Sequence, residues 1–119
     1  MQDYRKLRVW ERAHRLTLMV YRETAGFPET ERYGVTSQLR RSAASVPANI
    51  AEGSGRSTAR DFARFLDIAM GSAKEVDYHL LLSRDLGYLT PETHAALERD
   101  LHETSRMLTS FTNKVRATS

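Results

Sequence analysis

The stretch YGVTSQLRRSAASVPANIAEGSGR, residues 33–56, decides the fold of this chain. It combines a helical apolar pattern, two adjacent arginines and a proline, and it closes on Gly53-Ser54-Gly55. A proline inside a helix removes one backbone donor and crowds the carbonyl four residues earlier, at a cost of roughly 3 kcal/mol. We therefore expect Pro47 either to kink this helix or to split it into two helices.

A kink is the favoured interpretation, because the apolar stripe keeps its phase across the proline. The stripe recurs at steps of four, three and four residues through Leu39, Ala43, Val46 and Ile50. We expect the nearby Asn49 to bond the carbonyl that the proline leaves without a donor. The helix opens around residues 29–31, whose acidic side chains suit a helix N-terminus, and the Gly-Ser-Gly run predicts a turn after it.

The pattern before this stretch predicts a helix over about residues 6–25. Its apolar stripe runs through Val9, Trp10, Ala13, Leu16, Thr17, Val20 and Tyr21. Gly26 is expected to form a left-handed C-terminal cap, with Phe27 packing back on Tyr21 and Pro28 preventing continuation.

Two further helices follow the stretch. The third is expected to begin at Thr58, with Asp61 as its reciprocal capping partner, and to end at Gly87. The fourth is announced by Thr90-Pro91-Glu92, an N-cap followed by a proline at the first helical position. Its apolar seam has spacings of four and three residues through Leu97, Leu101, Thr104, Leu108, Phe111 and Val115.

The sequence therefore predicts an all-α fold. No segment alternates with period two, and the connections are short, so sequential helices should pack as antiparallel neighbours. We expect an up-down-up-down four-helix bundle, with its second helix kinked at Pro47. A chain of 119 residues fits a single domain over residues 1–119.

Composition excludes several classes of protein. The chain has no cysteine, which rules out disulfides, thiolate zinc sites and a cysteine nucleophile, and favours a reducing compartment. No apolar run reaches the roughly 20 residues that cross a bilayer, and the first residues lack a signal-peptide core. We expect a soluble, cytoplasmic protein without a membrane partner.

The charge is unevenly distributed along the chain. Residues 1–64 hold 12 Lys/Arg against 7 Asp/Glu, whereas residues 65–119 hold 6 against 8, within a net charge of +3. A basic surface attracts polyanions. Nucleic acid, RNA or DNA, is therefore a candidate partner.

Arginines that share helix faces are the candidate nucleic-acid contacts. They are Arg8, Arg12 and Arg15 on the first helix, Arg40 and Arg41 on the second, and Arg56, Arg60 and Arg64 around the start of the third. Guanidinium groups bind phosphates bidentately. The alternative, which the sequence leaves equally open, is that these arginines lie on solvated faces and pair with Glu11, Glu52 or Asp61.

Motifs for catalysis or metal binding are weak. His94, Glu98 and His102 fall on one face of the fourth helix, but no second set of ligands accompanies them, so we predict no metal and no cofactor. Arg8 and His14 faintly resemble the Arg-x(4–6)-His signature of HEPN ribonucleases. A chance match is the favoured interpretation in so arginine-rich a helix, and we predict no catalytic residues and no enzyme activity.

Three segments together resemble a known family. They are KLRVWERAH at residues 6–14, residues 33–56 with the run VPANIAEG, and residues 62–89 ending in LGYL. The chain is similar to the four-helix-bundle proteins encoded in intervening sequences of bacterial 23S ribosomal RNA genes, also called S23 ribosomal proteins. The resemblance covers residues 4–89, and residues 90–119 match only in helical character.

The resemblance implies an antiparallel four-helix bundle that assembles as a ring-shaped homopentamer. A related branch is the accessory variability protein of diversity-generating retroelements, a basic pentamer that binds nucleic acid and partners a reverse transcriptase. Among the candidate arginines, Arg40, Arg41, Arg56, Arg60 and Arg64 match the basic positions around the signature. The leading hypothesis is a non-enzymatic, oligomeric nucleic-acid-associated protein, and the alternative is a protein-interaction scaffold that binds no nucleic acid.

Overall fold

The apolar periodicity correctly predicts four helices. The protein, described here from a computed structural model over residues 3–119, is all-α across that range, with four α-helices and two short 3₁₀ turns. The elements, in chain order, are η1 (Tyr4–Lys6), α1 (Arg8–Thr24), η2 (Glu29–Glu31), α2 (Val35–Ser54), α3 (Ala59–Asp85) and α4 (Pro91–Ala117).

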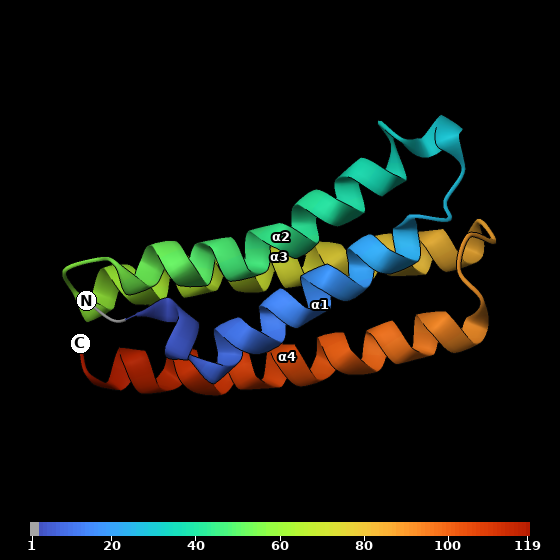
Figure 1. The fold of residues 1–119 in the computed structure, drawn as a ribbon. Helices are drawn as coiled ribbons and strands as arrows, with labels where there is room; N and C mark the ends of the chain where they lie inside the picture. Colours follow the sequence, from blue (N-terminus) through green and yellow to red (C-terminus); the bar gives the residue numbers. More distant parts are fainter. Residues whose placement is uncertain (1–2) are drawn as a thin grey trace.

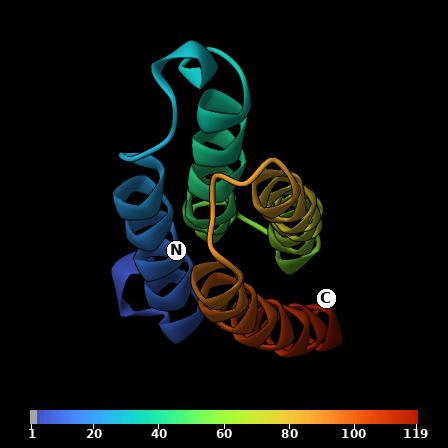
Figure 2. The same ribbon diagram turned by 90° about the vertical axis from the view of Figure 1, so that its right-hand side faces the viewer.

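The helices form an up-down-up-down bundle (Figure 1). Helix α1 contacts α2 and α4, and α3 contacts α2 and α4, so each helix packs on two neighbours around the bundle axis. Figure 2, which looks along the bundle, shows this cyclic order. The two chain ends and the α2–α3 turn lie at one end of the bundle, and η2 and the α3–α4 turn lie at the other (Figure 1).

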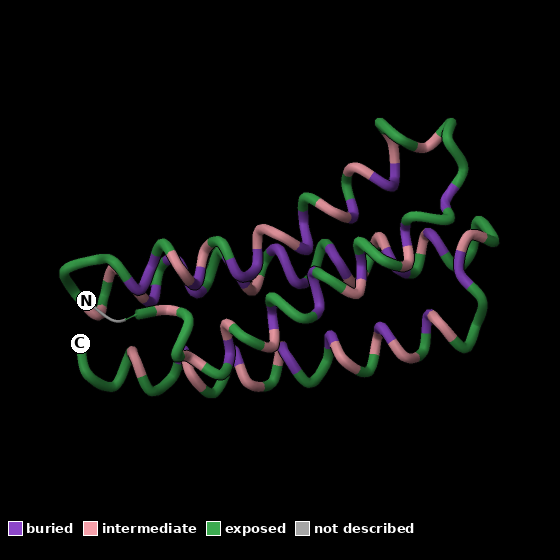
Figure 3. The backbone as a smooth tube through the Cα atoms, in the orientation of Figure 1, coloured by how far each residue is buried: buried purple, intermediate pink, exposed green. Residues whose placement is uncertain are grey.

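One hydrophobic core runs along the bundle, and all four helices contribute to it. Buried residues face inward and exposed residues face outward along each helix (Figure 3). The predicted stripe of α2 is fully internal, with Leu39, Ala43, Val46 and Ile50 at most 1% exposed. In α4, the predicted seam is buried from Leu97 to Leu108 and only partly buried at Phe111 and Val115.

Helix α2 is continuous across Pro47, so the alternative of two separate helices is wrong. Figure 1 shows its ribbon changing direction near the middle of the helix. The proline leaves the carbonyl of Ala43, four residues earlier, without its intrahelical donor. The single proton of the Thr17 hydroxyl of α1 is shared between this oxygen, at 3.1 Å, and the carbonyl of Ala13 in the preceding turn of α1, at 2.9 Å.

This arrangement corrects the role predicted for Asn49. Its amide donates to the Ser45 carbonyl at 2.8 Å and to the Ser45 hydroxyl at 2.9 Å, and it does not bond the carbonyl of Ala43. The donor comes from a residue 26 positions away in the chain. A pattern local to α2 therefore could not indicate it.

The end of α1 also differs from the prediction. Among residues 3–119, Gly87 is the one glycine with positive φ, so Gly26 is not a left-handed cap. Phe27 does not pack on Tyr21 as predicted but lies against Tyr88, with ring centroids 5.4 Å apart. Tyr21 is exposed, and the guanidinium of Arg40 lies over its ring at 4.6 Å.

The α3–α4 connection follows the sequence signals closely. Gly87 has φ of 82°, its N–H donates to the Arg84 carbonyl, and the Tyr88 N–H donates to the Ser83 carbonyl, both at 2.9 Å. These two bonds define a Schellman motif, which glycine favours because it has no Cβ. The Thr90 hydroxyl then accepts from the Thr93 N–H at 3.1 Å and caps α4 at Pro91.

A hydrogen bond fastens this connection to the loop after α1. The Tyr88 hydroxyl donates to Glu31 Oε2 at 2.8 Å. This bond, together with partial desolvation and the negative charge of the carboxylate, raises the pKa of Tyr88 above its ordinary value. We call Phe27, Glu31 and Tyr88 the aromatic end of the bundle.

At the opposite end, α2 approaches α3 closely. Gly53 lies in the last turn of α2, and a Cβ placed on it would lie 2.8 Å from Phe62 Cδ1 and 2.8 Å from Phe65 Cβ. The expected turn glycine is therefore a packing residue. Helix α3 begins after Thr58, whose hydroxyl accepts from the Asp61 N–H at 3.1 Å.

Candidate nucleic-acid interface

The structure divides the eight predicted arginines into two groups. Four of them make ion pairs or hydrogen bonds within the chain, namely Arg12, Arg40, Arg56 and Arg64. The other four are exposed and have no ion pair with residues 3–119, namely Arg8, Arg15, Arg41 and Arg60.

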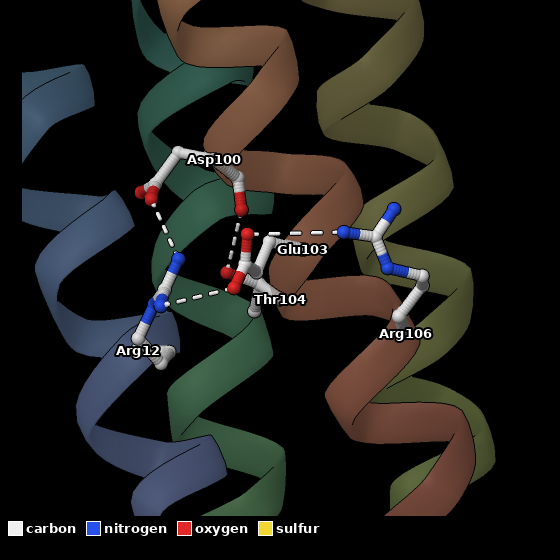
Figure 4. Close-up of polar contacts among 5 residues, drawn as sticks. All are labelled: Arg12, Asp100, Glu103, Thr104 and Arg106. Atoms are coloured by element: carbon white, nitrogen blue, oxygen red, sulfur yellow. Dashed lines mark hydrogen bonds and ion pairs between the residues drawn. The ribbon is translucent and has the colours of Figure 1, made fainter.

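Arg12 points from α1 into α4 and not to solvent (Figure 4). Its Nη2 lies 3.0 Å from Asp100 Oδ1 and its Nη1 lies 3.6 Å from Glu103 Oε1, and the Arg12 and Asp100 side chains are only 21% and 16% exposed. Glu103 also lies 3.7 Å from Arg106, which continues the network along α4. Carboxylates surround this guanidinium, so Arg12 is corrected from a phosphate contact to a connection between helices.

Arg40 is also engaged, at the C-terminus of α1. Its Nε donates to the Thr24 hydroxyl at 2.7 Å and its Nη2 donates to the Tyr21 carbonyl at 3.2 Å. A cation at a helix C-terminus satisfies carbonyls that lack intrahelical donors and favours the helix dipole. Arg40 therefore uses two of its nitrogens to satisfy the end of α1.

Arg56 and Arg64 share one carboxylate at the start of α3. Each Nε lies 3.0 Å from an oxygen of Asp61, and each guanidinium lies over the Phe65 ring, at 4.7 Å for Arg56 and 4.6 Å for Arg64. Pairing with Asp61, the alternative left open by the sequence, is thus correct for these two residues. Two cations on one anion still leave positive charge at this position.

Arg15 is exposed on α1 and Arg41 is exposed on α2. Arg41 lines a polar hollow of about 480 Å³ between α2 and α3, together with Gln38, Ser42, Ser45, Ser72, Glu75 and His79. Glu75 places negative charge in the same hollow. Both arginines remain predicted nucleic-acid contacts.

Six cations lie at the end of the bundle that holds the chain termini. Arg8 opens α1, Arg56, Arg60 and Arg64 surround the start of α3, and Lys114 and Arg116 lie in the last turn of α4. We call these six residues the basic end. Asp61, and Asp67 through its ion pair with Arg116, are its acidic neighbours.

Lys114 and Arg116 were not predicted from the sequence. They lie in the half of the chain whose net charge is negative, and each is an isolated cation in the helical pattern. The predicted topology could have indicated these two residues, because an up-down-up-down bundle places the last turn of its fourth helix beside the start of its third helix.

Three adjoining hollows line the basic end. A hollow of about 350 Å³ is lined by Arg56, the first residues of α3, Phe62, Phe111 and Lys114. A second, of about 630 Å³, shares Thr58 with it and holds Arg60, Arg64 and Arg116. A third, of about 240 Å³, shares Phe111 and Lys114 and holds Arg8. Cations from α1, α3 and α4 thus converge on one continuous surface.

The hollow beside Lys114 also contains aromatic rings. Phe62 and Phe111 pack edge to face with centroids 5.7 Å apart, and both line it. In the sequence Phe62 lies between Arg60 and Arg64, whereas Phe111 belongs to α4, far away in the chain. The fold supplies the combination of cations and rings that single-stranded nucleic acid favours.

The two residues of the faint ribonuclease motif, Arg8 and His14, both lie on α1. Six residues along a helix separate two side chains by about 9 Å and by about a third of a turn, so Arg8 and His14 lie on different sides of α1. The His14 ring instead stacks on Trp10, with centroids 4.9 Å apart and planes at 10°.

Within residues 3–119, no helix is both long and apolar enough to span a membrane.

Comparison with known proteins agrees with the resemblance seen in the sequence. The family model of the 23S rRNA-intervening sequence protein matches residues 5–110. A crystal structure of a protein with unknown function from the S23 ribosomal protein family, from Bacteroides thetaiotaomicron VPI-5482, has a TM-score of 0.78 and 26% identity, covering 87% of this chain and 97% of that chain. No curated protein matches this chain in sequence. Because the family model covers most of its length, the chain belongs to the 23S rRNA-intervening sequence protein family.

Proposed function

We propose that this protein is a non-enzymatic, oligomeric nucleic-acid-binding protein that contacts RNA phosphates with its basic end. The observation that carries the proposal is the gathering of six cations, five from three helices and Arg56 from the α2–α3 turn, around adjoining hollows. Phosphate contacts supply most of the affinity of a protein for nucleic acid, and they need cations that are free to approach the backbone.

The three unpaired cations are the primary contacts. Arg8, Arg60 and Lys114 are exposed and have no ion pair with residues 3–119, so they give up no internal partner when a phosphate binds. The N-terminus of α3 lies among them and adds the partial positive charge of its unpaired N–H groups. Arg56, Arg64 and Arg116 add positive potential while remaining bound to aspartates.

The aromatic rings favour RNA with unpaired bases. Phe62 and Phe111 lie in the hollow beside Arg56 and Lys114, where a base could stack while its phosphate meets a cation. Proteins recognise RNA sequence mainly in loops and bulges, whose bases are free to stack on aromatic side chains. We therefore expect a stem-loop to bind more tightly than a fully paired duplex of the same length.

Assembly would multiply these contacts. Exposed apolar side chains lie on the outer surface of α3, at Ile68, Tyr78 and Leu81, and they favour contact with another copy of the chain. The family resemblance suggests a pentamer, in which five copies of a chain of net charge +3 would carry about +15. Linked weak sites bind with far higher avidity than one site alone.

The test compares two triple variants of the full chain that remove the same charge. The first is Arg8→Gln/Arg60→Gln/Lys114→Gln at the basic end. The second, a matched control, is Arg22→Gln/Arg32→Gln/Arg99→Gln, which removes three arginines elsewhere. Dissociation constants for a fluorescent RNA stem-loop are measured across a salt series, and native mass spectrometry gives the number of copies in each variant.

We expect the basic-end variant to bind at least about tenfold more weakly than the control, and its salt slope to fall by about one unit for each phosphate that it no longer neutralises. Equal weakening in both variants would show that only overall charge matters and would overturn the basic-end assignment. Absence of RNA binding by the parent chain at low salt would favour the scaffold alternative, including a protein partner such as a reverse transcriptase. RNA cleavage that is abolished by His14→Ala would favour the ribonuclease alternative.

A further inference from the structure

Helices α3 and α4 bring three metal-ligating side chains together at their seam. Asp77 of α3 and Glu98 and His102 of α4 each offer one ligand atom, and these atoms all lie within 4.8 Å of one another. Glu98 and His102 are four residues apart and therefore share a face of α4. The sequence pattern groups Glu98 and His102 with His94, and the fold adds a carboxylate from another helix.

No arginine or lysine of the described chain offsets the two carboxylates. Among residues 3–119, neither Asp77 nor Glu98 makes an ion pair with Lys or Arg, and the basic group that Glu98 approaches is the His94 ring. Two carboxylates this close repel one another. A divalent cation between them would remove this repulsion.

A buried histidine supplies an independent observation. His94 is only 4% exposed, and its Nε2 has no hydrogen-bond partner. This nitrogen lies 4.0 Å from Glu98 Oε2, so it faces the carboxylate of the cluster. His94 is therefore buried, unlike the exposed His102 on the same helix. Buried polar atoms are rarely left without a partner, and exceptions call for an explanation such as an absent ion.

We propose that Asp77, Glu98 and His102 bind a divalent transition-metal ion of the Zn²⁺ type, and that His94 is a positioning residue for Glu98. Metal ions in such N/O sites lie about 2.0–2.2 Å from each ligand, so small side-chain rotations would close the cluster around an ion. Three protein ligands leave a position for water. The imidazole favours Zn²⁺ over Mg²⁺ or Ca²⁺, which prefer all-oxygen sites.

The role of His94 follows from the geometry of its ring nitrogen. Rotation of Glu98 toward the ion leaves one carboxylate oxygen able to accept a hydrogen bond from His94 Nε2–H. Such outer contacts orient a ligand, and their removal typically weakens metal binding about 10–100-fold. The ion would also join α3 to α4, at a place separate from the basic end.

The test uses the full chain, freed of metal with a chelator and titrated calorimetrically with Zn²⁺. We expect one ion per chain and no saturable binding of Mg²⁺ at the same concentrations. Glu98→Gln is compared with Glu92→Gln, the same exchange on the same helix, and His102→Gln is compared with His14→Gln, another exposed histidine. Glu98→Gln and His102→Gln should each weaken Zn²⁺ binding at least about tenfold, whereas both controls should match the parent chain.

A second measurement distinguishes a role of His94 in orienting the metal ligand from a role in stabilising the fold. The visible absorption of bound Co²⁺ reports its coordination geometry, so His94→Gln should alter this spectrum and weaken binding while circular dichroism shows a folded helical chain. An unaltered spectrum and affinity in folded His94→Gln would overturn the assigned role of His94. Unchanged Zn²⁺ affinity in Glu98→Gln and in His102→Gln would overturn the site itself.

Discussion

At the aromatic end of the bundle, side chains from two loops bond one another, whereas at the basic end the unpaired cations have no partner within residues 3–119. Phe27 packs on Tyr88, and the Tyr88 hydroxyl reaches Glu31, so residues 57 positions apart are held together. Arg8, Arg60 and Lys114 instead surround adjoining hollows. The same bundle therefore has one end that is closed by its own contacts and one that presents unpaired cations to solvent.

This difference separates stability from recognition. Groups that bond one another lower the energy of the folded chain, and cations that repel one another do not. Substitutions at the aromatic end should therefore change unfolding free energy and leave RNA affinity unaltered. Substitution of the unpaired cations at the basic end should do the opposite.

The largest expected effect is at the aromatic end. Phe27→Ala should destabilise the protein by about 3 kcal/mol, because it removes a ring packed against Tyr88 and the core. Urea denaturation followed by circular dichroism measures the change. Tyr33→Ala is the control, since Tyr33 is 86% exposed and should contribute less than about 0.5 kcal/mol. Equal destabilisation of the two variants would contradict a closed aromatic end.

The packing beneath the basic end should give the next largest effect. Gly53→Ala places a Cβ 2.8 Å from Phe62 and Phe65 atoms, and we expect a decrease in stability of about 2 kcal/mol from overpacking. Gly71→Ala is the matched control, because a Cβ there meets nothing within 4 Å. Alanine in the middle of a helix should stabilise by about 0.5–1 kcal/mol. Thermal unfolding of both variants should therefore shift in opposite directions.

A smaller effect is expected from the hydrogen bond between the loops. Tyr88→Phe removes the bond to Glu31 and should lower stability at pH 7 by less than Gly53→Ala. Because the folded-state pKa of Tyr88 is raised, this contribution is fully present below the ordinary tyrosine pKa of about 10 and is lost as pH rises through the raised value. The stability gap between the parent chain and Tyr88→Phe should therefore close at strongly alkaline pH. A gap that stays constant would contradict the assigned bond.

The smallest effect on stability should come from the unpaired cations. Arg60→Gln/Lys114→Gln should change the free energy of unfolding by less than about 0.5 kcal/mol, since neither side chain makes an ion pair with residues 3–119. The same variant should bind the RNA stem-loop more weakly. A clear decrease in stability would mean that these side chains serve the fold, and the two ends would no longer differ.

Local sequence signals account for most of the fold. The apolar periodicity predicts all four helices, and the caps at Gly87 and Thr90 form as their local sequences indicate. At Thr58 only half of the expected reciprocal cap forms, because the Asp61 carboxylate pairs with Arg56 and Arg64. These signals act within one turn of a helix, where propensity and capping determine the backbone. Two local predictions fail. The chain leaves α1 without a left-handed residue at Gly26, and residues 29–31 form the separate turn η2 while α2 begins only at Val35.

Contacts between side chains that are far apart in the chain could not be predicted from the sequence. Arg12 pairs with Asp100 across 88 positions, and Phe27 finds Tyr88 and not the nearby Tyr21. The same limitation applies to the candidate sites, where Lys114 joins Arg8 and Asp77 joins Glu98 only after the helices pack. Residue types and helix faces could be predicted, but the partner of each side chain required the three-dimensional arrangement.

Pro47 has a consequence for how α1 and α2 are aligned. Interdigitated side chains and the hydrogen bond between Thr17 and the carbonyl of Ala43 together fix their register. The carbonyl of Ala43 that the proline exposes can be met only by a hydroxyl at the same height, which Thr17 provides at 3.1 Å. A slip of one turn would strand that oxygen in a dry interface. The proline thereby helps to set the register of α1, and with it the height at which Arg8 emerges beside α4.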